Sequence, residues 1–282
     1  MSVTELCWAT TPNGTKLAYE RRVSAEGPPL LALHGILVGT SNWIHQVLRL
    51  PRFRWLLPHL RGHGMSPPPM PRQTIEEAAL DAVSVLDAEH VQTAVVLGNS
   101  LGATIALALA LMRPERVQGL VLVEPSLPAL AGEDERERLR ASADLVRALL
   151  AADRIDEALA HFLEPRLGPD WRQKAGQRRL EEWRRNVFST PAWIEAVLAF
   201  DPGPVPLAAL DRPTLLVYGA ETQAAYRRTI FALAELLPNA EVVEIPEAGH
   251  GAPVDNPDAF NDILLAFLRR IDILTDSANT FR

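Results

Sequence analysis

Apolar residues occur along this chain in short continuous runs, which alternate with longer segments whose apolar positions follow helical spacing. In segment 74–90, six apolar residues between Ile75 and Leu86 recur at intervals typical of one helix face. Thr74, with Glu77 three residues later, predicts a capping box at the start of that helix. Runs of strand length lie at 29–35, 54–60, 93–98, 117–125, 212–219 and 240–246, and further helical segments lie at 101–115, 226–238 and 256–271.

The short runs are mostly apolar along their whole length, without alternation of apolar and polar positions. Strands have this pattern when helices cover both faces of a sheet. The regular alternation of strands and helices favours a mainly parallel sheet. Segments 4–11 and 15–22 flank the turn sequence Pro-Asn-Gly and predict an antiparallel hairpin at the sheet edge. The predicted fold class is α/β, with a mainly parallel twisted sheet flanked by helices.

The alternation of strands and helices stops between residues 126 and 206, where the sequence is helical and no strand is evident. A long helical insertion between two strands of a sheet predicts a lid over a binding site. We therefore predict a core formed by residues 1–125 and 207–275, and a helical cap segment formed by residues 126–206. The Pro-rich stretch 201–213 is interpreted as the linker that returns the chain to the core.

The composition and the net charge exclude some classes of binding partner. The chain has 282 residues, of which 48% are hydrophobic, and a chain of this length can bury a large core. Its net charge is −7 and it has no concentrated basic stripe, so we expect no nucleic-acid partner. The most basic stretch, 172–185, alternates with acidic residues. We interpret it as a solvated helix face, with an anion contact as the alternative.

The sequence also bears on location and cofactors. The single cysteine, Cys7, excludes a disulfide framework and a cysteine metal site. No signal-peptide pattern is visible, and the longest apolar run, 103–112, is too short to span a bilayer. The histidines and carboxylates show no metal-ligand spacing, so we expect no metal and no cofactor. We expect a cytoplasmic monomer or homodimer with a small-molecule substrate and no membrane partner.

The pentapeptide GNSLG, residues 98–102, stands where a predicted strand gives way to a predicted helix. It fits the pattern G-x-S-x-G of a nucleophile elbow in that context. Such a turn forces the serine into strained backbone angles, and a side chain at either glycine would collide with the adjacent strand or helix. The Oγ of Ser100 would then stand at a helix N-terminus, where backbone N–H groups can hold a developing anion.

Together with four other segments, this elbow resembles the α/β-hydrolase superfamily, and the resemblance covers nearly the whole chain. The other segments are LALHGILVGTSNW at 31–43, similar to the His-Gly loop of that family, LRGHGMS at 60–66, LVLVEP at 120–125, and EAGHGAPVDNPDAF at 247–260, similar to the catalytic-histidine loop. These motifs are specific for the fold and much less so for the substrate. The resemblance implies an α/β-hydrolase fold with the helical cap inserted after the sixth strand.

The resemblance also implies roles for individual residues. Ser100 would be the nucleophile, and His250, flanked by two glycines, would be the general base that a hydroxyl nucleophile needs. The oxyanion hole would consist of the backbone N–H groups of Leu101, after the nucleophile, and of Ile36, after the His-Gly pair.

The resemblance leaves the acid of the triad open between alternatives. Most members of the family carry Asp three residues after the glycine that ends the seventh strand, and this chain has Thr222 there. Glu124, at the end of the sixth strand, is the preferred acid, because a charge that ends a buried strand needs a partner and His250 is the natural one. Glu221 is the alternative acid, and a chain with no acid is the third possibility.

For the substrate pocket we expect contributions from His34, Gly35, Trp43, Trp183 and Phe188. His34 is expected to order its loop by hydrogen bonds rather than to act as a base. Aromatic residues of the cap segment are interpreted either as packing residues or as an apolar roof over the substrate.

The leading hypothesis is a serine hydrolase that cleaves an ester or a lactone through an acyl-enzyme. The runner-up is a carbon–carbon bond hydrolase of the meta-cleavage-product type, whose elbow GNSLGA resembles, although those enzymes typically keep the Asp that is absent here. The alternative of another class is a non-catalytic ligand receptor on the same fold. The missing Asp favours it, and the intact Ser100, His250 and glycine loops are evidence against it.

Overall fold

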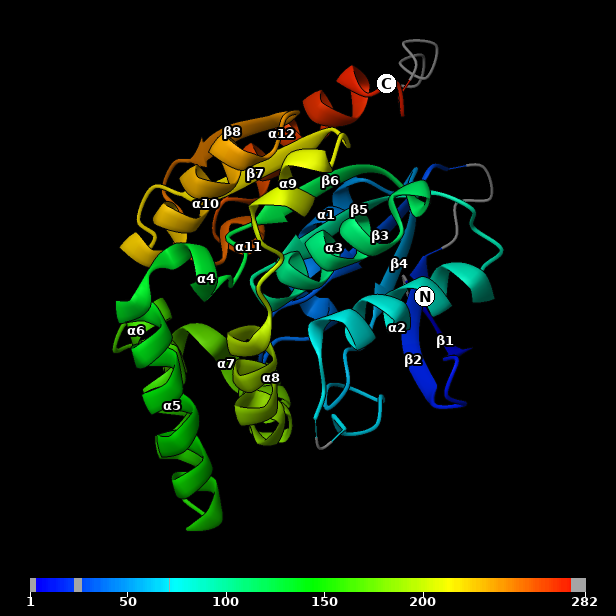
Figure 1. The fold of residues 1–282 in the computed structure, drawn as a ribbon. Coiled ribbons are helices and arrows are strands. Elements are labelled where there is room, and N and C mark those ends of the chain that lie inside the picture. The colour runs from blue at the N-terminus through cyan, green and yellow to red at the C-terminus, as the bar shows by residue number, and fades with distance from the viewer. Residues whose placement is uncertain (1–3, 23–26, 71, 275–282) are drawn as a thin grey trace.

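A computed structural model describes residues 4–22, 27–70 and 72–274, and the ends of the predicted core, residues 1–3 and 275, lie outside them. Its centre is an eight-stranded sheet in the order β1-β2-β4-β3-β5-β6-β7-β8 (Figure 1). The strands are β1 (Glu5–Thr10), β2 (Lys16–Arg22), β3 (Pro29–Leu33), β4 (Arg54–Pro58), β5 (Ala94–Asn99), β6 (Val117–Val123), β7 (Thr214–Gly219) and β8 (Ala240–Ile245).

The sheet is mainly parallel. β1 pairs with β2, and β2 with β4, in antiparallel register, whereas every pairing from β4 through β3 to β8 is parallel. β1 is an edge strand. The predictions of an α/β fold and of an antiparallel hairpin at the sheet edge are therefore confirmed.

Helices cover both faces of the sheet, as the continuous apolar strands predict. Along β5, Val96 belongs to the core cluster on one face, while Val95 and Leu97 belong to the cluster on the other. The near face in Figure 1 carries α2 (Ile75–Ala88), α3 (Leu101–Met112) and α10 (Ala224–Leu236), and the far face carries α1 (Ile44–Arg49) and α12 (Pro257–Arg270).

The start of α2 shows how a local signal fixes an element. The Thr74 side chain accepts a hydrogen bond from the Glu77 backbone N–H at 3.1 Å, and the Glu77 carboxylate accepts one from the Thr74 N–H at 3.0 Å. The predicted capping box is confirmed.

A series of helices separates β6 from β7 along the chain, and no strand is described among them. They are α4 (Pro128–Ala131), α5 (Glu133–Ala151), α6 (Ile155–Leu167), α7 (Trp171–Asn186), α8 (Thr190–Ala199) and α9 (Pro204–Ala209), with the 3₁₀ turn η3 (Val187–Ser189) between α7 and α8. Figure 1 shows α5 to α8 projecting beyond one end of the sheet. Two details differ from the sequence reading. The helical segment 126–206 is interrupted between α5 and α6, where Asp153 has φ 57°, and the expected linker 201–213 contains α9.

The remaining elements are the 3₁₀ turns η1 (Thr40–Trp43) and η2 (Pro114–Arg116) and the short helix α11 (Ala252–Asp255). None of the described helices combines the length and the apolar character that are required to cross a membrane.

The junction of β5 and α3 is a turn that only glycines permit. A Cβ at Gly98 would lie 2.3 Å from the Gly102 carbonyl oxygen, and a Cβ at Gly102 would lie 2.2 Å from the Leu33 carbonyl oxygen. These atoms belong to the backbone of α3 and β3, which cannot move aside independently. The two glycines therefore allow α3 to pack directly against the sheet behind Ser100.

We expect Gly102→Ala to lower the free energy of unfolding by about 2–3 kcal/mol, because a clash with backbone is overpacking that no rotamer relieves. Gly119→Ala in β6 is the matched control. Its Cβ would meet the Ile271 Cδ1 atom at 2.7 Å, the far end of a flexible side chain. Urea unfolding of both variants measures the difference, and equal losses would contradict this account of the turn.

Candidate active site

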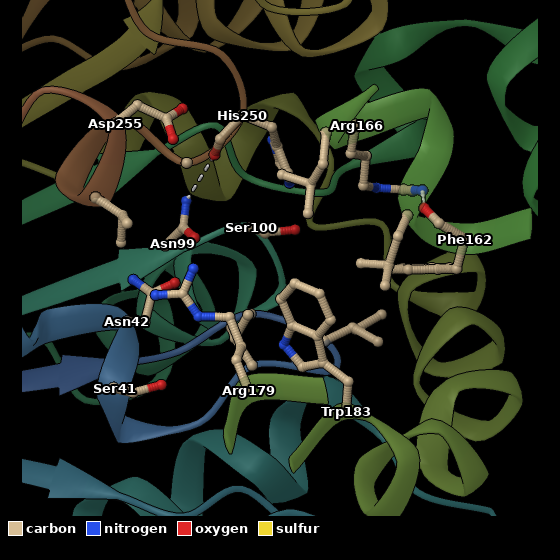
Figure 2. A pocket seen from close by; sticks show the side chains of 17 residues that line it. Ser41, Asn42, Asn99, Ser100, Phe162, Arg166, Arg179, Trp183, His250 and Asp255 are labelled. Atoms are coloured by element: carbon tan, nitrogen blue, oxygen red, sulfur yellow. Dashed lines mark hydrogen bonds between the residues drawn. The ribbon is translucent and has the colours of Figure 1, made fainter. Parts of the chain in front are cut away.

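Ser100 occupies the turn between β5 and α3 in a strained conformation, with φ 55° and ψ −118°. Its N–H donates to the Val123 carbonyl at 2.9 Å and continues the pairing of β5 with β6. A non-glycine residue with positive φ persists only where its surroundings enforce it, and such residues cluster at functional sites. Figure 2 shows the Ser100 hydroxyl pointing into a pocket that His250 also lines.

His250 and Glu124 form a close pair. Nδ1 of His250 lies 2.6 Å from Oε2 of Glu124, whose side chain is fully buried. His250 comes from the loop after β8 and Glu124 directly follows β6, so two carboxyl ends of parallel strands bring them together. This contact fixes the imidazole with Nδ1 toward the carboxylate and leaves Nε2 for another partner.

The Glu124 carboxylate has two further donors. The Gly219 N–H donates to Oε1 at 2.8 Å, and the Thr222 hydroxyl donates to Oε2 at 2.7 Å. Thr222 is the residue that stands where the resembling family usually has Asp, and here it contacts the acid on the neighbouring strand. Glu221, the alternative acid, is exposed, and among the described residues no hydrogen bond or ion pair joins its carboxylate to His250.

Neighbouring groups hold the His250 loop in place. The Tyr226 ring from α10 stacks on the imidazole, with ring centroids 4.0 Å apart and planes at 19°. The Asn99 side-chain amide donates to the His250 carbonyl at 3.3 Å, as Figure 2 shows. Gly219 permits the close approach of β7, because a Cβ there would lie 2.2 Å from the Ala248 carbonyl oxygen.

The two residues expected to supply the oxyanion hole both lie close to Ser100 along the fold. Leu101 is the first residue of α3, where N–H groups have no acceptor within the helix. Ile36 lines the same pocket as Ser100, in the loop after β3. The next residue, Leu37, has φ 70°, so this loop is strained as well.

Two buried histidines accept hydrogen bonds from the backbone of this loop and of the loop after β4. The Leu37 N–H donates to Nε2 of His63 at 3.2 Å, and the Leu60 N–H donates to Nε2 of His34 at 3.2 Å. Their rings lie 4.8 Å apart. Burial lowers the pKa of His63 to about 4 and the pKa of His34 well below its usual value. Both are therefore neutral at pH 7, as acceptors of backbone hydrogen bonds must be.

The pocket is a cavity of about 120 Å³ between the strand ends and helices α6 and α7. Of the residues expected there, Gly35 and Trp183 line it, together with Ser100, His250 and Ile36. Phe162, one of the cap aromatic residues considered for an apolar roof, also lines it. Residues that sequence reasoning did not assign to it are Val38, Ser41, Asn42, Asn99, Leu163, Arg166, Leu167, Arg179, Gly251, Val254 and Asp255.

Three expected pocket residues are not among those that line this cavity. Trp43 is fully buried against Phe260 on the far face of the sheet, with ring centroids 6.1 Å apart. Phe188 is 58% exposed. His34 is buried beneath the loop and lines a separate polar cavity. The prediction of pocket contacts is wrong for these three, whereas the expectation that His34 orders its loop agrees with its hydrogen bond.

Two arginines of the basic stretch 172–185 differ in their surroundings. Arg184 forms an exposed ion pair with Asp156 at 2.9 Å, as a solvated face would. Arg179, on the same helix, is half-buried and lines the pocket. The sequence contains no signal that separates these two arginines, because both are surrounded by alternating charges.

Among the described residues, no three His, Cys, Asp or Glu side chains gather in a way that could hold a metal ion. The absence of a cofactor remains a prediction.

Comparison with known proteins extends this picture. A family described as alpha/beta hydrolase fold matches residues 28–257. A 2-hydroxymuconate semialdehyde hydrolase of Pseudomonas sp. (strain CF600) is 29% identical over 88% of this chain and 89% of its own length. A pimeloyl-[acyl-carrier protein] methyl ester esterase of Pectobacterium atrosepticum is 29% identical over 88% and 97%. The crystal structure of a hydrolase from Pseudomonas aeruginosa superposes with a TM-score of 0.79 at 30% identity, over 94% and 98%.

The buried His63 predicts a specific pH dependence of stability. The pKa of His63 is about 4 in the folded protein and 6.5 when unperturbed. Between these two pH values the unfolded chain binds a proton at this residue and the folded chain does not. The neutral His63 ring therefore makes its full contribution to the free energy of unfolding above pH 6.5. This contribution is lost as the pH falls toward 4, and the loss is about 2 kcal/mol at pH 5.

The free energies of unfolding of wild type and His63→Gln, measured in urea at pH 7.5 and pH 5, check this. Glutamine can accept the Leu37 hydrogen bond but does not titrate. We therefore expect the stability difference between the two proteins to shift in favour of the variant by about 2 kcal/mol at the lower pH. A difference that does not change with pH would refute the prediction.

Proposed function

The chain belongs to the alpha/beta hydrolase fold family, and from this premise we propose that it is a serine hydrolase that cleaves an ester or a lactone. One observation carries the proposal. The His250 Nδ1 atom lies 2.6 Å from the buried Glu124 carboxylate, at the wall of the same pocket into which the strained Ser100 points. This is the arrangement of a base, its orienting acid and a nucleophile.

In the proposed reaction, the Ser100 Oγ atom attacks the substrate carbonyl and its proton passes to Nε2 of His250. Glu124 keeps the imidazole in the tautomer that can accept this proton and stabilises the imidazolium that forms. The Leu101 and Ile36 N–H groups hold the negative charge on the former carbonyl oxygen.

Collapse of the tetrahedral intermediate breaks the bond to the alcohol oxygen, which receives the proton from His250. Water then attacks the acyl-enzyme with His250 as base, and the acid leaves Ser100. With a lactone, the alcohol released in the first step stays tethered, and the product is a hydroxy acid.

The name of the Pectobacterium relative, a methyl ester esterase, supports the ester class. The name of the Pseudomonas relative, 2-hydroxymuconate semialdehyde hydrolase, favours a second candidate, the carbon–carbon bond hydrolase. Thr222, in place of the Asp that such carbon–carbon bond hydrolases typically keep, is evidence against the second. A non-catalytic receptor would need neither the strained Ser100 nor the buried pair of His250 and Glu124.

We further propose that the cap segment, residues 126–206, acts as a lid on a core of residues 1–125 and 207–275, since α6 and α7 supply part of the pocket wall. A cytoplasmic location, a monomeric or homodimeric state and the absence of nucleic-acid and membrane partners remain expectations.

The first experiment separates an enzyme from a receptor. Wild type and Ser100→Ala are treated with a fluorophosphonate probe and assayed on 4-nitrophenyl esters, small lactones and a vinylogous 1,5-diketone of the meta-cleavage type. We expect labelling and ester or lactone hydrolysis by wild type only. Turnover of the diketone alone would favour the second candidate, and a wild type that is neither labelled nor active would favour the receptor.

The identity of the acid is tested with two isosteric substitutions. We expect Glu124→Gln to lower kcat by about 10³-fold or more, because an amide cannot stabilise the imidazolium and favours the wrong tautomer. Glu221→Gln, at the exposed residue before Thr222, should leave kcat within about 2-fold of wild type. Thermal unfolding confirms that both variants fold, and a loss confined to Glu221→Gln would transfer the role to that residue.

A further inference from the structure

One side of the pocket presents hydrogen-bond donors that have no acceptor. Arg179 reaches into the pocket from α7, and among the described residues no hydrogen bond or ion pair joins its guanidinium to another side chain. Glu182, three residues further along α7, accepts a hydrogen bond from the Ser41 hydroxyl at 3.2 Å, and Arg179 acts on its carboxylate only through a longer-range attraction that Arg178 and Arg185 share. Figure 2 shows the Arg179 side chain extending toward the side of the pocket where Asn42 lies.

Two residues of the same pocket wall each have a buried neutral donor. The side-chain nitrogens of Asn42 and Trp183 are buried and have no hydrogen-bond partner among the described residues. Asn42 is 6% exposed and Trp183 is 2% exposed. A buried donor without an acceptor costs stability, so two of them beside an unpaired cation indicate a site shaped for an acceptor-rich group.

The other charged residues of the pocket wall make hydrogen bonds within the protein. Arg166 donates to the Phe162 carbonyl at 2.5 Å and lies over the ring of the same residue. Asp255, the carboxylate of the wall, accepts the Gly249 N–H at 3.0 Å. Arg179 is the cation of the pocket wall whose guanidinium has no hydrogen-bond acceptor among the described residues, and its fork of N–H groups matches a carboxylate in geometry and in charge.

We propose that Arg179, with the side-chain N–H groups of Asn42 and Trp183, binds a carboxylate of the substrate that is not the group being cleaved. This inference rests on the proposed function, because the carbonyl that reacts must lie at Ser100 in the same pocket. The substrate is then a monoester of a dicarboxylic acid, or a lactone that carries a free carboxylate. The apolar wall formed by Phe162, Leu163 and Leu167 would contact the chain between the two groups.

A matched pair of esters tests the inference. The 4-nitrophenyl monoester of glutaric acid carries a free carboxylate, and 4-nitrophenyl 5-methylhexanoate replaces it with an isopropyl group of the same shape. We expect Arg179→Met to lower kcat/KM for the glutarate ester by about 10- to 100-fold, the effect of one charge-assisted hydrogen-bonded pair. It should leave kcat/KM for the neutral ester within about 2-fold. Arg179→Lys should restore part of the loss.

Arg178→Met is the control, since Arg178 is exposed on the same helix and does not line this pocket. It should leave the ratio of kcat/KM values for the two esters unchanged. Equal losses on both esters in Arg179→Met would assign Arg179 a structural role, and unchanged activity on both would remove it from substrate binding. Either result overturns the inference while leaving the hydrolase proposal intact. A wild type inactive on both esters and unlabelled by the fluorophosphonate would overturn the proposed function itself.

Discussion

The buried carboxylate of Glu124 is the constraint on which the arrangement of the site depends. A charge without water is very costly unless donors surround it. Here three donors come from two segments, namely the Gly219 N–H at the end of β7 with the Thr222 hydroxyl of the turn after it, and the His250 ring after β8. Because these donors converge on one side chain, the Glu124 carboxylate holds the ends of three adjacent strands in one relative position.

Strain in the backbone follows the same edge of the sheet. Leu37, Ser100 and Glu124 all have positive φ, although none of them is glycine. Each follows a parallel strand at its carboxyl end, where the chain must turn sharply out of the sheet and present a side chain or an N–H group to the pocket. The tightly packed glycine contacts of α3 against β3, and of β7 against the His250 loop, provide the rigidity that keeps such conformations from relaxing.

The fold could be predicted from sequence because its signals are local. The capping box of α2 involves two residues three positions apart, and a strand covered on both faces is apolar throughout. Glu124 could be singled out because a charge at the end of such a strand needs a partner. The walls of the pocket could not be predicted in this way. In η1, Asn42 lines the pocket while its neighbour Trp43 enters the core beneath the sheet, and both are buried. In α7, Gly176 has φ 70° and interrupts the helix, so no single period relates the two ends of that segment.

Apolar contacts and hydrogen bonds join the cap segment to the loop after β3, and these contacts determine the shape of the pocket. Leu37 is buried within the apolar cluster of the cap, and its carbonyl accepts a hydrogen bond from the Asn186 side chain at 2.7 Å. The Ser41 hydroxyl donates to Glu182 of α7, and burial raises the pKa of that carboxyl. The helix that carries Arg179 and Trp183 is thus attached to the loop that carries the Ile36 N–H. A displacement of α7 would therefore move the proposed carboxylate site and one half of the proposed oxyanion hole together, so substrate recognition and charge stabilisation depend on the same contacts.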